Sequence, residues 1–220
     1  MKRDIVSTIV YDFSHTVVLS FIPALRIIRH PHTDKESMMR SLKIQGGAVI
    51  IANHTSFKDP LLLTIAFWRR RVSYIAAEAV LKNKVARWLL LHAGCIEVNR
   101  NIFDFACVKK SIEVLKSGTP VVMFPEGGMT KNEHSSFKSG MTLMAAQAGV
   151  PIIPVYIAPN KGITHMIHMV IGEPIDVSAM CGGSKMPSKA ILDDITAAVE
   201  QREEELRQTY ENKYAKRKDK

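Results

Sequence analysis

Residues 48–60 read AVIIANHTSFKDP, a short apolar run followed at once by a polar one. An apolar run of this length, bounded by polar residues and containing β-branched ones, is typical of a buried strand. The polar run ends on Asp59 and Pro60, and proline is favoured in the first turn of a helix. The stretch therefore predicts a strand whose end delivers polar side chains to a loop that enters a helix.

The same alternation continues along the chain. Strands are expected at 48–52, 72–76, 95–98, 120–124, 152–157 and 166–171, and helices at 60–68, 81–92, 102–116 and 138–148. Strands that alternate with helices form a parallel or mixed sheet with helices on its faces. We expect an α/β domain over residues 42–181, with a mixed, largely parallel sheet flanked by helices.

Two further segments flank this domain. Residues 1–29 place apolar side chains at intervals of one, three or four between basic ends, which predicts an amphipathic helix broken near Pro23. Such a helix can associate with a membrane surface or pack on its own domain, because both uses need the same periodicity. Residues 30–41 are a polar linker, and residues 187–220 are expected to form a C-terminal charged helix and tail.

Composition narrows the class of protein. The chain has 220 residues, 46% of them hydrophobic and 23% charged, which disfavours disordered, collagen-like and disulfide-scaffold proteins. Its net charge of +9 favours an anionic partner: nucleic acid, an anionic membrane surface or a phosphorylated substrate. The basic run at 69–71 comes with no nucleic-acid recognition motif, so we expect no nucleic-acid partner.

The spacing of the cysteines and histidines indicates whether disulfides or a metal site are expected. Cys95, Cys107 and Cys181 are odd in number and form no CxxC pair, which favours a reducing, cytoplasmic environment. His165 and His168 lack an evident third ligand, so we expect neither a metal nor a cofactor. No uncharged apolar run reaches the roughly 18 residues that a membrane-spanning helix needs.

The first candidate for chemistry is the pair His54 and Asp59, in the loop after the first strand of the domain. A carboxylate bonded to one ring nitrogen of a histidine leaves the other nitrogen to accept a proton from a hydroxyl. A His-x4-Asp spacing alone is weak evidence. Asp59 also fits a plain structural role, because aspartate before proline is a common helix N-cap.

The second candidate is the turn at residues 124–128, which follows another predicted strand. The consecutive glycines Gly127 and Gly128 expose backbone N–H groups that suit an anionic oxygen, although glycines in such turns are more often only structural. Glu126 is a plausible ligand for a substrate hydroxyl. Arg100 ends a strand segment and Lys138 opens a later helix; each fits a surface charge, or a phosphate site where strand ends converge.

Four sequence blocks occur in an order that resembles the glycerolipid acyltransferases typified by 1-acylglycerol-3-phosphate acyltransferase. Residues 53–59 are similar to the NHxSxxD block of that family, and residues 94–100 to a second block that closes on an arginine. Residues 124–127 match the FPEG block, and residues 150–155 are similar to the VPIxPV block. One such block is a weak signal, but four in order are a strong one.

The resemblance implies a reaction. His54 would take a proton from an acceptor hydroxyl, which attacks the thioester of acyl-coenzyme A or acyl-carrier protein without an acyl-enzyme intermediate. Asp59 would orient His54, Glu126 and Gly127 would bind the glycerol part of a lysoglycerolipid acceptor, and Arg100 would bind its phosphate. The basic, apolar N-terminal helix would place such an enzyme at the cytoplasmic face of a membrane as a peripheral protein.

One departure from the family pattern affects the acceptor. The third block usually continues Gly-Thr-Arg-Ser, whereas this chain has Met129 where the arginine would stand. Lys131, Lys138 or Arg100 would have to supply the cation, and lysine lacks the guanidinium fork. Lysophosphatidate is the leading acceptor, and another lysolipid or a non-phosphorylated alcohol is the alternative. Two further alternatives are a catalytically silent lipid-binding protein and a hydrolase that uses the same base on water.

Overall fold

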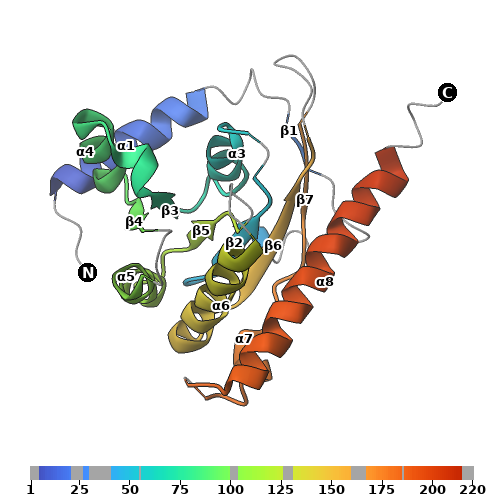
Figure 1. Cartoon of the computed structure of the whole chain (residues 1–220). Coiled ribbons are helices and arrows are strands. Elements are labelled where there is room, and N and C mark those ends of the chain that lie inside the picture. The colour runs from blue at the N-terminus through green and yellow to red at the C-terminus, as the bar shows by residue number, and fades with distance from the viewer. Residues whose placement is uncertain are drawn as a thin grey trace.

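The computed structural model describes residues 5–20, 27–29, 41–54, 56–99, 104–125, 131–159, 167–184 and 186–214. Its strands are β1 (Ile27–Arg29), β2 (Val49–Ala52), β3 (Ser73–Ala77), β4 (Ile96–Val98), β5 (Val121–Met123), β6 (Ile152–Ile157) and β7 (Ile167–Ile171). They form one sheet in the order β1-β7-β6-β2-β5-β3-β4 (Figure 1). Only the pair β6 and β7 is antiparallel among these strands, so the predicted mixed, largely parallel sheet is confirmed.

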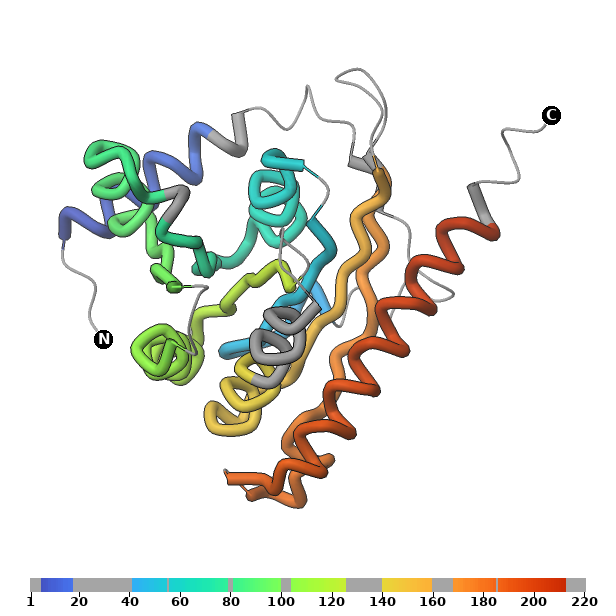
Figure 2. The backbone as a smooth tube through the Cα atoms, in the orientation of Figure 1, coloured from blue at the N-terminus to red at the C-terminus, as the bar shows by residue number. Residues whose placement is uncertain are grey.

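Helices flank the sheet. They are α1 (Ile5–Ser20), α3 (Asp59–Ala66), α4 (Lys84–His92), α5 (Phe105–Lys116), α6 (Lys131–Ala148), α7 (Val177–Met180) and α8 (Lys189–Tyr214), with a 3-10 helix, η2 (Glu78–Leu81), before α4. The figures show α8 running along one side of the molecule and α1 with α4 at the opposite side (Figures 1 and 2). None of the helices in the described ranges is long and apolar enough to cross a membrane.

The six strands expected from the sequence are present with bounds shifted by at most a residue. The seventh strand, β1, corrects a prediction, because residues 27–29 were expected to continue the N-terminal amphipathic helix. They pair in parallel with β7 instead, with Ile27 opposite Ile167. Three apolar or basic residues at a sheet edge carry too little periodicity to distinguish a strand from a helical turn. Residues 1–4 and 21–26 of that predicted helix lie outside the described ones.

The core lies on both faces of the sheet. Side chains along a strand alternate between faces, so Val49 and Ile51 of β2 pack against α5, α6 and α8 while Ile50 and Ala52 pack against α3. A sheet covered on both faces needs strands that are apolar throughout. This explains why β2 and its neighbours read as continuous apolar runs.

The C-terminal helix α8 is part of this packing. It lies along β6, β7 and α6, and it buries Ile195, Val199 and Leu206. The chain reaches α8 through Gly182 and Gly183, whose φ values of 56° and 78° are in the left-handed region that favours glycine. The expected charged tail after Tyr214 lies outside the described residues.

Helix α1 packs against α3 and α4 through its inner side. The Tyr11 hydroxyl accepts a hydrogen bond of 2.8 Å from the Val72 N–H. Arg71 donates to both carboxylate oxygens of Asp12, at 2.6 and 2.8 Å. The outer side of α1 is apolar and exposed, and its side chains are Ile5, Val6, Ile9, Phe13 and Val17.

Candidate active site

The site begins where three parallel strands end together. Strand β2 lies between β5 and β6, and Ile50 is in register with Val122 and Ile153. Loops that follow such strands emerge at the same edge of the sheet, where α/β proteins usually bind ligands. Polar groups that follow β2 and residues that follow β5 are therefore brought close together.

Asn53, the first residue after β2, fixes the start of the loop. Its side-chain amide donates 2.8 Å to the Ile157 carbonyl and accepts 2.7 Å from the Ile157 N–H. These two bonds join the end of β2 to the end of β6. Sequence reasoning assigned Asn53 no role, and its position directly before His54 was the one available signal.

His54 and Asp59 meet, as the spacing predicts. His54 Nδ1 lies 3.0 Å from Asp59 Oδ2, and the Ser56 N–H donates to the same oxygen at 2.7 Å. The Asp59 side chain is 1% exposed, whereas that of His54 is 31% exposed. Burial of a carboxylate is costly unless donors satisfy it, and here a ring N–H and a backbone N–H do so.

This contact sets the tautomer of His54. A carboxylate only accepts hydrogen bonds, so in the neutral imidazole Nδ1 carries the hydrogen and Nε2 has the lone pair. The imidazole lines a cavity while its Nδ1 is held by Asp59. The arrangement leaves Nε2 as the nitrogen that can accept a proton from a bound molecule.

The structure corrects the N-cap interpretation of Asp59. Helix α3 starts at Asp59 itself, and the N-cap position is Lys58, which makes no side-chain capping bond. The Asp59 carboxylate turns back toward the loop, where His54 and the Ser56 N–H bind it. Pro60 does lie in the first turn of the helix, as expected.

Phe124, the first residue of the FPEG block, lies next to His54. It follows β5, is buried, and stacks on the imidazole with ring centroids 4.6 Å apart and planes inclined by 30°. Sequence reasoning named the block but gave Phe124 no part in it. An aromatic residue at the end of a central strand was the signal for a packing role.

The other predicted site residues are not brought together by the described part of the chain. Arg100, Glu126, Gly127 and Gly128 lie outside the described residues, as does Met129. Lys138 was expected to open a helix, but α6 starts seven residues earlier, at Lys131, so that prediction is wrong. The serine pair at 135–136 and Gly140 are poorer helix formers, which hid the first half of α6 from the sequence pattern.

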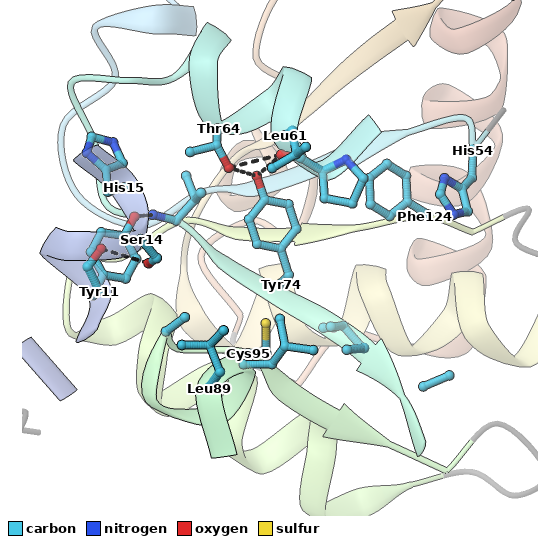
Figure 3. A pocket seen from close by; sticks show the side chains of 17 residues that line it. Tyr11, Ser14, His15, His54, Leu61, Thr64, Tyr74, Leu89, Cys95 and Phe124 are labelled. Carbon is cyan, nitrogen blue, oxygen red and sulfur yellow. Dashed lines mark hydrogen bonds between the residues drawn. The ribbon is translucent and has the colours of Figure 1, made fainter. Parts of the chain in front are cut away.

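A cavity of about 330 Å³ extends from His54 (Figure 3). Its walls come from α1, α3, β3 and α4, and they are mostly apolar, including Leu61, Ile75, Leu90 and Phe124. In Figure 3, His54 and Phe124 lie at one end and Tyr11 and His15 of α1 at the other, with Tyr74 between them. The cavity suits an apolar chain whose polar end lies at His54.

Tyr74 ties the cavity wall to the start of α3. Its hydroxyl lies 2.7 Å from the Pro60 carbonyl oxygen and 2.7 Å from Thr64 Oγ1. Burial raises the pKa of Tyr74 well above its ordinary value, so this group stays a neutral hydroxyl. Because Pro60 follows Asp59, the contact also holds the turn that carries the carboxylate.

The remaining titratable groups do not form a second reactive centre in the described ranges. Cys95 lines the cavity, but burial raises its pKa to about 11, so the thiol is protonated at neutral pH. The buried thiol of Cys107 likewise has a pKa raised by burial to about 11. Within the described residues, no three His, Cys, Asp or Glu side chains gather in a way that could hold a metal ion. His168 lies on β7, and His165 is outside these residues.

Comparison with known proteins gives three findings. The sequence profile of the acyltransferase family matches residues 30–158. The chain is 28% identical over 171 residues to a 1-acyl-sn-glycerol-3-phosphate acyltransferase of Bacillus subtilis, covering 76% of this chain and 84% of that protein. It is 33% identical over 120 residues to a probable 1-acyl-sn-glycerol-3-phosphate acyltransferase of Mycoplasma genitalium, covering 52% of this chain and 45% of that protein.

The fold also resembles a solved structure. The crystal structure of the 1-acyl-sn-glycerophosphate (LPA) acyltransferase PlsC from Thermotoga maritima has a TM-score of 0.58 to this chain and is 21% identical to it. The match covers 90% of this chain and 80% of that one. At this level of identity the likeness concerns the sheet and its flanking helices.

Proposed function

Because the chain belongs to the acyltransferase family, as its four sequence blocks predicted, we propose that it esterifies a lysoglycerolipid. The acyl group comes from the thioester of acyl-coenzyme A or acyl-carrier protein, and the leading acceptor is 1-acylglycerol-3-phosphate. The observation that carries the proposal is the contact between His54 Nδ1 and the buried Asp59 carboxylate, made where the imidazole borders an apolar cavity.

His54 acts as the general base in this proposal. Nε2 accepts the proton of the acceptor hydroxyl while the hydroxyl oxygen forms a bond to the thioester carbonyl carbon. The bond from that carbon to sulfur then breaks, and the proton passes to the leaving sulfur. A hydroxyl is a poor nucleophile until a positioned base removes its proton, and such a base typically contributes about 10²–10⁴-fold in rate.

Asp59 acts on the acceptor only through His54. Its carboxylate keeps the hydrogen of the neutral imidazole on Nδ1, so Nε2 is the nitrogen that accepts, and it stabilises the imidazolium that forms. Its burial and its second bond, from the Ser56 N–H, prevent the carboxylate from swinging away into water. Asp59 is therefore a positioning residue for the base.

The apolar cavity accommodates the fatty acyl chain. Each methylene group taken out of water stabilises binding by about 0.8 kcal/mol, and the walls offer few polar atoms to compete. The chain would run from the thioester at His54 past Tyr74 toward α1. The neutral hydroxyl of Tyr74 is already bonded to Pro60 and Thr64, so the tyrosine presents an apolar ring to the chain.

The acceptor would bind on the loop after β5. Glu126 and the backbone of Gly127 and Gly128 hold its glycerol part, and Arg100 and Lys138 supply positive charge for a phosphate. The stack of Phe124 on His54 supports this, because Phe124 leads directly into that loop.

The Met129→Arg variant tests which acceptor is used. It should improve kcat/KM for a phosphorylated acceptor severalfold, and an unchanged preference would favour a non-phosphorylated one.

The protein meets its acceptor at a membrane surface in this proposal. The exposed apolar stripe of α1 is suited to lie among lipid headgroups, as a peripheral contact on the cytoplasmic face. The membrane-associating segment is the part of residues 1–29 that precedes β1. Residues 42–181 are the acyltransferase domain and residues 187–220 the C-terminal helix and tail.

One assay tests the proposal. The protein is incubated with labelled acyl-coenzyme A or acyl-carrier protein and a panel of lysolipids, and ester products are identified by mass spectrometry. Ester formed only in the presence of a lysolipid supports it. Lipid binding without ester from any donor would point to a silent binding protein, and thiol release without an acceptor would point to a hydrolase.

A further inference from the structure

Helix α4 carries apolar side chains that the described part of the protein does not cover. Its sequence is KVARWLLLH, and none of its nine residues is buried. Val85 is 75% exposed and Trp88 50% exposed. A helix that is apolar over most of its surface is normally buried, and nine residues are too few for a stable helix without packing.

Helix α1 lies beside α4 and has the same property (Figure 1). Ile5, Ile9, Phe13 and Val17 are four residues apart, so they share one side of α1, and all are exposed. Tyr11 and the other cavity-lining residues of α1 lie on its opposite side. We call the exposed apolar side chains of the two helices the α1–α4 face; they are Ile5, Val6, Ile9, Phe13, Val17, Val85, Trp88, Leu89 and Leu91.

The charges around α4 identify its partner. Residues 82–92 contain lysines at 82 and 84 and no acidic residue, while Arg87 is paired with Glu97 at 2.7 and 2.6 Å. Lys82 and Lys84 are exposed at the start of the helix. Cationic side chains next to an apolar face are attracted to anionic lipid headgroups, and tryptophan is enriched at the boundary between headgroups and hydrocarbon. A second copy of this basic chain would be repelled at the same place.

The cavity reaches this face. Leu61 of α3 and Leu89 of α4 both line the cavity, and each is still 43% exposed (Figure 3). Leu89 therefore belongs to the cavity wall and to the outer surface at once. A lipid chain at the α1–α4 face would have a continuous apolar route into the cavity.

We propose that α4 is a second membrane-contacting element, which together with α1 seats the protein on an anionic bilayer and turns the cavity toward the hydrocarbon. The part of this that concerns the cavity rests on the proposed function. The part that concerns the bilayer does not, because it depends only on the exposed apolar side chains and on Lys82 and Lys84.

Trp88 reports directly on the contact. The chain has two tryptophans, so a Trp68→Phe background leaves Trp88 as the only one. The probe is vesicles of phosphatidylcholine with phosphatidylglycerol, with or without bromine on the acyl chains. Trp88 emission should shift to shorter wavelength on binding, and brominated chains should quench it. Protein that floats with vesicles while Trp88 neither shifts nor is quenched would overturn the proposal.

Substitutions give a second measurement. The double variant Val85→Ser/Trp88→Ser removes two exposed side chains of α4 that do not line the cavity. Its partition onto the same vesicles should fall about tenfold or more, since tenfold corresponds to roughly the transfer free energy of one apolar side chain. The matched control is Met186→Ser, which removes an 81% exposed side chain from the segment between α7 and α8; its partition should not change.

The same variants separate this proposal from the proposed function. With monomeric, short-chain substrates the double variant should turn over like the unaltered protein, and with vesicle-borne acceptor it should lose activity in proportion to its partition. Quenching of Trp88 without any ester product would reject the proposed function and leave the membrane face standing. Unchanged partition of the double variant, or a dimer that buries α4 and ignores vesicles, would reject the face.

Discussion

Helices α3 and α4 are nearly equal in length, and each carries three consecutive leucines, yet they differ in how deeply the protein buries them. Helix α3 has five buried residues, Leu62 and Leu63 among them, whereas α4 has none. Leu62 and Leu63 of α3 pack on β2 and so fix the start of the helix, which carries Asp59. The apolar side chains of α3 are buried in the protein's own core, whereas those of α4 are left for the bilayer that we propose as its partner.

The polar side chains near α3 are held by hydrogen bonds within the protein, whereas the α1–α4 face consists of exposed apolar side chains. Around α3, Asp59 has two donors and Asn53 bonds both backbone groups of Ile157. The Tyr74 hydroxyl lies 2.7 Å from the Pro60 carbonyl oxygen and 2.7 Å from the Thr64 hydroxyl. A site in which each group is fixed by others loses function when one member is removed. A face made of exposed apolar side chains instead loses binding in steps. Substitutions in the site should therefore have larger effects on turnover than single substitutions on the exposed face have on binding.

His54→Ala should have the largest effect. Turnover should fall by about 10²–10⁴-fold, because the base that accepts the hydroxyl proton is gone. The protein should stay folded, with a melting temperature lowered by several degrees, because the buried Asp59 carboxylate loses one of its hydrogen-bond donors. Thiol release from acyl-coenzyme A in the presence of a lysolipid measures the rate. His92→Ala, in α4, is the control and should leave turnover of monomeric substrates intact; a folded His54→Ala protein with full turnover would contradict the role.

Asp59→Asn should slow turnover by about 10²-fold. The amide can keep the Ser56 N–H bond, but it no longer fixes the hydrogen on Nδ1, so His54 spends time in the wrong tautomer. The matched control is Asp176→Asn, which alters an exposed aspartate that caps α7 far along the chain. Equal rates for the two variants would remove Asp59 from the mechanism.

Leu63→Ala and Leu91→Ala test the two leucine triplets directly. Leu63 is fully buried, so its truncation should lower the free energy of unfolding by about 2–5 kcal/mol. Leu91 is 37% exposed, so its truncation should lower that free energy by about 1 kcal/mol or less. Urea unfolding followed by circular dichroism measures both. Similar losses would mean that α4 is packed inside the protein after all.

Ala76→Phe should change which acyl chains are accepted. Ala76 lies on β3 in the cavity wall, and a benzyl group there would occupy space along the path of the chain. We expect kcat/KM for long-chain donors to fall about tenfold relative to short-chain donors, which corresponds to one or two methylene groups that no longer fit. An equal change for all chain lengths would indicate that the chain binds elsewhere.

The sequence was sufficient for the sheet and for the first contact of the site. Buried parallel strands are apolar throughout, so β2, β5 and β6 stood out, and His54 and Asp59 lie close enough in the chain to meet through one loop. The contact is present, and the catalytic roles of the two residues stay a prediction. Asp59 was also expected to cap α3, which is wrong because loop donors bind its carboxylate first.

The sequence could not predict contacts between site residues that are far apart in the chain. Phe124 lies 70 positions from His54 and Tyr74 lies 14 from Pro60, and nothing local records that these groups touch. The helix at 81–92 was expected to cover the sheet, because its leucines have the same hydropathy as those of α3. Only the tertiary neighbours distinguish a leucine that faces β2 from one that faces outward.

The central claim is that His54 and Asp59 act as one unit, and a double-mutant cycle tests it most directly. Turnover is measured for His54→Ala, for Asp59→Asn and for the protein with both changes, with the same donor and lysolipid. Asp59 acts only through His54 in this account, so the double variant should be as fast as His54→Ala alone, to within about twofold. If the two losses multiply instead, Asp59 works independently of the imidazole and the account is wrong.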